Sequence, residues 1–268
     1  MIKGSHFITK RSRSRHFKKL KGICLSLMFI LLTSSFHRAV KESDAVLILH
    51  FRAYVHGEPL ELNKKYKNPF GETFEISRFR FYAGKIAPIY LDTESKINIS
   101  LYHLVDFSDS SSTSMDLPVT AGTCNGIQFQ LGVDSLDQNQ GAQTGALDPV
   151  KGMFWTWNSG YQSFKIEGYS PVSSQPAHVI AYHIGGYRDP YNTVWKIKLN
   201  TTNDESFQIT AANKITIEVA IDLDSFFDGR NPLHIKEISS CTTPGELARR
   251  ISENFIGTFT GLTLTPDK

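Results

Sequence analysis

Residues 76–82 read ISRFRFY, where aromatic residues alternate with arginine at Phe79, Arg80 and Phe81. A period of two places successive side chains on opposite faces of a strand, so this stretch predicts a half-buried β-strand. Seven further strand-like runs lie between clusters of turn-forming residues, at 45–55, 96–105, 126–131, 162–167, 177–183, 193–199 and 215–223. This series predicts an all-β fold, a single antiparallel β-sandwich.

The helical signal is restricted to the C-terminal part of the chain. Residues 243–254 read TPGELARRISEN, with Thr243 as the expected N-cap and Pro244 in the first turn. Leu247, Ile251 and Phe255 recur every four residues and would share one apolar face. We therefore expect one short C-terminal helix beside the sandwich.

Residues 135–152 contain few large apolar side chains and predict a long loop. Long loops inside compact domains are usually functional. Asp134, Asp137 and Asp148 match no EF-hand spacing, so we expect them to cap and form turns. Arg78 and Arg80 are expected to lie on a solvated face. No linker divides the sequence, so residues 40–268 are expected to form one domain.

The N-terminal 39 residues hold nine of the 29 Lys and Arg residues and none of the 26 Asp and Glu residues. The rest of the chain is therefore acidic, which argues against a nucleic-acid-binding surface. A basic block at 10–21, an apolar run at 23–32 and small residues at 33–35 are typical of a secretory signal. Ten helical residues span only ~15 Å, so an uncleaved membrane anchor is the weaker alternative.

Export would place residues 40–268 in the periplasm or at the cell surface, with membrane contact only through residues 1–39. Cys124 and Cys241 would then form one disulfide or remain two buried thiols. The sequence contains no C-x-x-C, G-x-S-x-G, H-E-x-x-H, P-loop or G-x-G-x-x-G pattern. We therefore expect a binding protein and not an enzyme.

Aromatic residues are concentrated directly behind the long loop, at Met153-Phe154-Trp155, Trp157 and Tyr161. Trp155 and Trp157 are two residues apart, so they would share one face of a strand. Two indoles on one face usually form a core or an aromatic wall. The second interpretation is a pocket with the polar loop at its rim.

This block resembles the MbnP-like copper-binding protein family, named for a methanobactin-associated periplasmic protein, in its Bacteroidetes-type branch. The matching elements are LGV at 131–133, Asn139, LDP at 147–149, GMFWTW at 152–157, GY at 160–161 and YHIGG at 182–186. Phe51, Gly57, Leu60, Tyr66 and residues 77–82 resemble the family's opening strands. The likeness spans about residues 45–262.

The resemblance implies an exported β-sandwich that binds one copper ion through histidine and a tryptophan oxidised to kynurenine. The oxidation would be carried out by a di-haem, peroxidase-like partner of the cytochrome c peroxidase family. On this chain the implied metal residues are His183 and either Trp155 or Trp157. Imidazole binds copper well and intact indole does not, whereas opening the indole ring exposes an aniline nitrogen.

The chain departs from the family pattern at one position. Copper-binding relatives carry a histidine directly after the loop asparagine, whereas here Gln140 follows Asn139. A neutral amide oxygen is a weak ligand for Cu(I), so a second imidazole must come from elsewhere. His103 is a candidate if its strand neighbours that of His183, and His50, His56 and His234 are further options. His178 lies five residues before His183 and would face the opposite side of a regular strand. The alternative function is a non-metal binding module that uses the aromatic pocket.

Overall fold

The computed structural model describes residues 44–92, 102–156 and 158–266. The predicted export segment 1–39, Trp157 and most of the predicted strand 96–105 lie outside the described residues. The residues described from Asp44 onward belong to one compact unit. Within these ranges, no helix has the length and apolar character that a membrane crossing requires.

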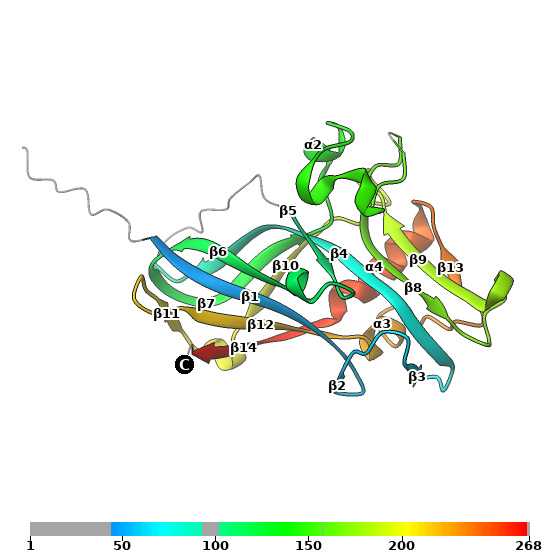
Figure 1. Ribbon diagram of the computed structural model, residues 1–268, viewed down its shortest axis with the longest axis horizontal. Coiled ribbons are helices and arrows are strands. Elements are labelled where there is room, and N and C mark those ends of the chain that lie inside the picture. The colour runs from blue at the N-terminus through cyan, green and yellow to red at the C-terminus, as the bar shows by residue number, and fades with distance from the viewer. Residues whose placement is uncertain (1–43, 93–101, 157, 267–268) are drawn as a thin grey trace, which may run out of the picture. The chain divides into compact units, whose positions relative to one another are not determined.

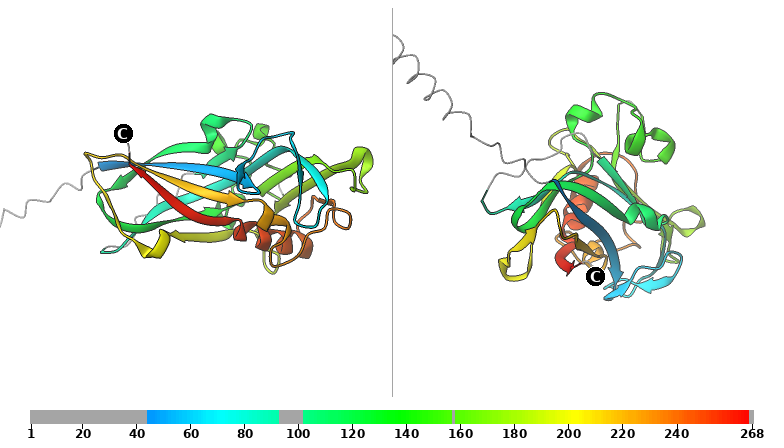
Figure 2. Two further views of the ribbon diagram at one scale, coloured as in Figure 1. Left: turned by 90° about the horizontal axis from the view of Figure 1, so that it is seen from below. Right: turned by 60° about the vertical axis from the view of Figure 1, so that its left-hand side comes forward.

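The described strands form two sheets (Figures 1 and 2). The five-stranded sheet contains, in order, β14 (Phe259–Pro266), β12 (Ile215–Asp222), β1 (Asp44–Val55) and β2 (Glu58–Pro59), with β6 (Ser114–Thr120) also paired to β1. The nine-stranded sheet contains β10 (Trp195–Asn200), β7 (Gly122–Leu131), β4 (Thr73–Tyr90), β8 (Gln162–Tyr169), β9 (Val179–Gly185) and β13 (Ser240–Cys241). β11 (Phe207–Ile209) pairs with β7, while β3 (Lys65–Lys67) and β5 (Tyr102–Asp106) pair with β4.

The predicted all-β, sandwich-like fold is confirmed, and its sheets are mixed. Most pairs are antiparallel, but β1 runs parallel to β12 and β13 runs parallel to β9. Leu47 of β1 lies opposite Ile215 of β12, so strands far apart in sequence become neighbours. The chain between β1 and β12 forms most strands of the other sheet, because two parallel strands need a crossover connection.

The core is aromatic and lies between the two sheets. Phe79 and Phe81 of β4 are fully buried, as the alternating pattern predicts. The Phe51 ring of β1 meets the Phe81 ring edge-on at 5.2 Å between centroids, which joins the two sheets. Each such side chain contributes about 1.5–3 kcal/mol through burial.

The predicted C-terminal helix is α4 (Glu246–Gly257). Ile251 and Phe255 are buried, and Phe255 stacks on Phe164 of β8 at 4.0 Å. Gly245 occupies the N-cap and no side chain caps the helix, so the predicted Thr243 cap is wrong. The backbone turns at Pro244–Gly245 before the helix begins, which leaves Thr243 outside it.

The two cysteines are separate buried thiols, the second of the two interpretations. Cys124 lies on β7 and Cys241 on β13, with three strands of the same sheet between them. Burial raises the pKa of Cys124 to about 12 and raises that of Cys241 above its usual value. Neither thiol is ionised near neutral pH, so both behave as core residues.

Strand β4 determines where the long loop leaves the sheet. Phe81 pairs with Val105 of β5 and Phe164 of β8, while Ala83 pairs with β5 and with Leu131 of β7. Strands β7 and β8 therefore share the edge of β4 that faces away from β5. Residues 132–161 leave the sheet at the end of β7 and return beside it at the start of β8, and Figure 1 shows them standing out from the sheet around α2 (Ser135–Gln138).

Candidate metal site

The loop between β7 and β8 builds a second, smaller core on the outer face of the nine-stranded sheet. Its buried members are Tyr82, Val133, Leu147, Met153 and Tyr161. Short helices at Ser135–Gln138, Gly145–Leu147 and Pro149–Lys151 shape the loop. Its aspartates cap and form turns as predicted: Asp134 caps α2 and Asp148 caps the third of these helices.

Tyr161 anchors this loop from within. Its hydroxyl donates to the Leu147 carbonyl at 2.7 Å and accepts from the Gln143 amide at 2.9 Å. The Tyr161 amide donates to Oε1 of the buried Gln138 at 2.7 Å. A Cβ on Gly160 would lie 2.0 Å from that same oxygen, and Gly160 has a φ of +71°. The Gly-Tyr pair is therefore required by packing and by backbone conformation.

Trp155 lies on a short hairpin at the end of the loop. The Trp155 amide donates to the Gly160 carbonyl at 3.0 Å, and the Gln162 amide donates to the Met153 carbonyl at 2.8 Å. The half-buried indole of Trp155 packs on Gly185 of β9, where a Cβ would lie 2.8 Å from Cζ3. The absence of a side chain at Gly185 makes room for this ring.

His183 precedes Gly185 by two residues on β9, so both positions lie on the same, outer face of the sheet. The Trp155 ring therefore packs at the outward-facing position of β9 that follows His183. The His183 side chain is 20% exposed, and its Nε2 lies 2.7 Å from Oε1 of Glu167. The hydrogen bond from His183 is the largest cause that lowers the pKa of Glu167 to about 2, with Lys165 and Arg78 adding to it.

Charged residues form a continuous row beside His183. Asp106, Arg80, Lys165 and His183 lie opposite one another on β5, β4, β8 and β9. Arg80 pairs with Asp106 at 2.7 Å and donates to the Lys151 carbonyl at 2.8 Å. Arg80 is thus half-buried and held by an ion pair and a hydrogen bond, which corrects the expectation of a solvated face, whereas Arg78 is exposed as expected.

Lys165 completes the attachment of the loop to the sheet. It is buried and donates to the Gly152 carbonyl at 2.7 Å. Burial lowers the pKa of Lys165, while the charge of Glu167 acts in the opposite direction. Sequence reasoning missed Lys165 and Glu167. Their alternation with the apolar Phe164 and Ile166 was the available signal, because a period of two puts both charges on one face of the strand.

His103 does not join His183. It lies opposite Ala83, whose side chain belongs to the main core, so His103 faces the inner side of the sheet. Its Nε2 lies 2.6 Å from the Ser112 carbonyl. His183 faces outward, so the two histidines lie on opposite sides of the sheet.

Two other positions weighed from the sequence also have local partners. His178 lies in the turn before β9, where its Nδ1 contacts the Ser173 carbonyl at 3.1 Å. Gln140 is exposed and donates from Nε2 to Asp137 at 3.3 Å. In the part of the chain that the structure describes, no three His, Cys, Asp or Glu side chains converge as a metal-binding group.

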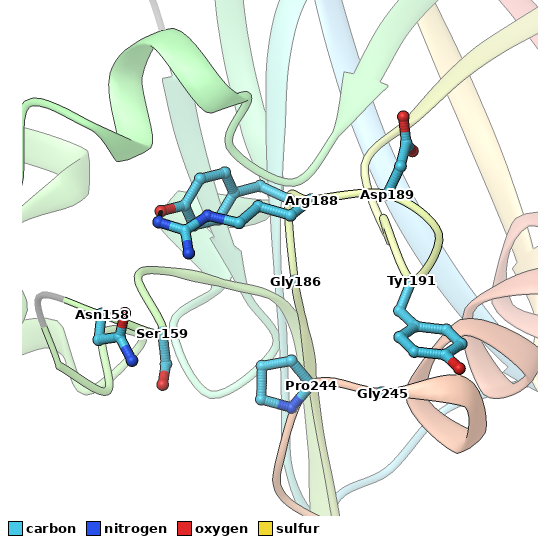
Figure 3. A pocket seen from close by; sticks show the side chains of 9 residues that line it. Asn158, Ser159, Gly186, Arg188, Asp189, Tyr191, Pro244 and Gly245 are labelled. Carbon is cyan, nitrogen blue, oxygen red and sulfur yellow. Dashed lines mark hydrogen bonds between the residues drawn. The ribbon is translucent and has the colours of Figure 1, made fainter.

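A pocket of about 280 Å³ opens next to the Trp155 hairpin (Figure 3). The hairpin tip contributes Asn158 and Ser159, and the segments after β9 and before α4 complete its wall with Gly186, Tyr187, Arg188, Asp189, Tyr191, Pro244 and Gly245. The Arg188 guanidinium lies 5.0 Å from the centre of the Tyr187 ring and donates to its hydroxyl at 2.9 Å. The pocket therefore combines aromatic surface with one cationic and one anionic residue, Arg188 and Asp189.

Comparison with known proteins gives one family match and one similar solved structure. A family model described as MbnP matches residues 44–243. The chain belongs to the MbnP family. Among solved structures, MbnP from Methylosinus trichosporium matches with a TM-score of 0.56, covering 84% of this chain and 100% of that chain. Its sequence identity is 11%, so this likeness concerns the fold. No curated protein matches the sequence.

The residues described near the Trp155 hairpin offer few donors for the copper that MbnP-family membership makes plausible. His183 offers one imidazole at a half-buried position, and the ring of Trp155 packs on Gly185, two residues farther along β9. Imidazole is a favourable copper ligand, and an opened indole would add a nitrogen donor. Neither Gln140 nor His103 is placed by a described contact to complete the set. The candidate donors among these residues are therefore limited to β9 and the Trp155 hairpin.

Proposed function

We propose that this MbnP-family protein is an exported copper-binding protein that sequesters or delivers copper and is not an enzyme. One observation carries the proposal: the Trp155 ring packs on Gly185, the next outward-facing position after His183. The two elements that resemble the family's copper motifs lie far apart in sequence. Their packing against each other puts the oxidisable indole at the outward-facing position of β9 next to that of the imidazole, which supports the proposal.

The residues of this chain have separate roles in the proposed site. His183 would supply the imidazole ligand, and the copper ion would be the cargo that the protein holds. Trp155 would become a donor after peroxide-driven oxidation by a di-haem peroxidase-like partner. Insertion of two oxygen atoms across the indole C2–C3 bond, followed by hydrolysis, would release C2 as formate and leave an aniline nitrogen. Arg80 and Lys165 hold the loop on the sheet through two carbonyls, which keeps the Trp155 hairpin in place.

The test is elemental analysis of the exported protein isolated from its native host, because a recombinant chain could lack the oxidising partner. Near-stoichiometric copper is expected, and peptide mass spectra should show kynurenine at Trp155 or Trp157. His183→Asn should lose the copper, while the matched control His178→Asn should keep it, since the His178 ring is held by the Ser173 carbonyl and the Tyr169 ring. Trace copper in the wild-type protein after growth in added copper would reject the proposal.

A second candidate function, a non-metal binding module, is favoured by the pocket beside the hairpin. Its wall of aromatic residues with one cation and one anion suits an organic ligand with a planar, polar group. The exposed Gln140 in place of the family histidine points the same way. A co-purifying organic molecule in copper-free native protein, lost in Arg188→Ala, would support this candidate over copper binding.

A further inference from the structure

The contact between His183 and Glu167 determines which nitrogen of the imidazole is free. Nε2 of His183 lies 2.7 Å from Oε1 of Glu167. Nδ1 makes no hydrogen bond to any residue that the structure describes. The two ring nitrogens therefore have different surroundings: Nε2 is bound to Glu167, and Nδ1 has no hydrogen bond among the described residues.

We propose that Glu167 is a positioning residue that holds the Nε2–H of His183 and so presents Nδ1 as the copper-binding nitrogen. This inference rests on the proposed function, because it names the atom through which His183 would bind the metal.

The proton in this contact must belong to the histidine. Oε2 of Glu167 accepts from the Arg78 guanidinium at 2.8 Å, and the Lys165 ammonium lies 3.8 Å from Oε1. Two cations beside one carboxylate keep it ionised, and an ionised carboxylate only accepts hydrogen bonds. Nε2 is therefore the donor, so in the neutral imidazole Nδ1 carries the free electron pair.

Glu167 is poorly placed to bind the metal itself. Both its oxygens are already engaged, by His183 and by Arg78. The adjacent positive charges of Arg78 and Lys165 would oppose a cation at those oxygens. A carboxylate that accepts the second N–H of a ligating histidine is a common arrangement around protein-bound metals, where it fixes the ring orientation.

The sheet holds this arrangement rigid. Lys165 lies opposite His183 across the β8–β9 pair, and Glu167 lies opposite Ala181. Glu167 is thus diagonal to His183 on the same face, two residues along β8 from Lys165. A side chain on a paired central strand changes its position less than one on a loop, so the ring is oriented before any metal arrives.

The test begins with the metal-free protein, in which copper binding plays no part. Long-range proton–nitrogen NMR of the histidine rings distinguishes a protonated from a bare nitrogen, and His183→Asn assigns the signal. In the wild-type protein we expect Nε2 protonated, Nδ1 bare and a slowly exchanging ring N–H. Glu167→Ala should lose the slow N–H and mix the two tautomers, whereas Glu75→Ala, a carboxylate on neighbouring β4, should change neither.

The same spectrum in wild-type protein and in Glu167→Ala would overturn the proposal. Glu167→Gln serves as the second variant, because its amide oxygen can still accept the N–H while the side chain keeps its shape.

Titration with Cu(II) alone then separates positioning from direct binding. Loss of an outer carboxylate partner typically weakens metal binding ~10–100-fold, so we expect that loss in Glu167→Ala and a smaller one in Glu167→Gln. An equal loss in both variants would make the carboxylate a ligand and overturn the positioning role. If the NMR result holds but wild-type protein binds no copper, the proposed function fails while the ring orientation stands.

Discussion

Replacement of Gly185 by alanine tests the contact on which the candidate site depends. The new Cβ would lie 2.8 Å from Cζ3 of Trp155, 2.8 Å from the Tyr161 carbonyl oxygen and 3.0 Å from the Gln162 Cα. Carbon atoms rest at ~3.5–4.0 Å, so the indole would have to move by roughly 0.7 Å or more. The two backbone contacts cannot relax so easily, because they belong to the β8–β9 pair.

Overpacking of this kind costs about 1–3 kcal/mol in free energy of unfolding. For a domain of this size the corresponding fall in melting temperature is roughly 2–12 °C. The assay is urea unfolding of wild-type protein and Gly185→Ala, with Gly261→Ala as the control. A Cβ on Gly261 meets no atom within 4 Å, so its change should stay within about 0.5 kcal/mol.

A double-mutant cycle assigns the cost to the indole. Trp155→Ala removes the ring, so Gly185→Ala should cost less in that background, with a coupling energy of about 0.5–3 kcal/mol. The remaining cost reports the clash with the backbone of Tyr161 and Gln162. Additive effects, or an unchanged stability in Gly185→Ala, would refute the packing of Trp155 on Gly185 and with it the argument for the site.

Three further outcomes follow from individual contacts. Burial tends to raise the pKa of Glu72, but hydrogen bonds from Asn68 and from the Ile235 and Lys236 amides outweigh burial and lower that pKa. The ionised Glu72 carboxylate therefore stabilises the fold above its unfolded pKa of ~4.3, and this stabilisation is lost as the pH falls. Urea midpoints of wild-type and Glu72→Gln protein should therefore differ most near neutral pH and converge in acid; a constant difference would contradict this. The thiols of Cys124 and Cys241 should react with a thiol reagent only after denaturant is added, and fast labelling of either residue in the native protein, located by peptide mass spectra, would show that it is not buried. Gln140→His should raise Cu(II) affinity in calorimetric titration if its loop position borders the metal, and an unchanged affinity would place that position away from it.

Local patterns predicted much of the fold. The alternation at Phe79, Arg80 and Phe81 identified β4, because a period of two is a property of neighbouring residues. The four-residue recurrence that ends at Phe255 identified α4 for the same reason. The short strands β2, β3, β11 and β13 escaped prediction, since two or three residues carry no measurable period. Strands β6 and β14 were also missed.

The sequence alone determined the alternation of inward and outward residues on strands that it identified, such as β4, and it pointed to His183 and Trp155 through a resemblance of motifs. Only the tertiary structure decided that the Trp155 ring packs at Gly185, two residues from His183, because Gly185 leaves space for the indole across the β8–β9 pair. The pairing of β5 with β4 likewise put His103 on the inner face, away from His183. Strand register is a long-range property that adjacent residues do not encode, and a change of one position moves a side chain to the other face of the sheet.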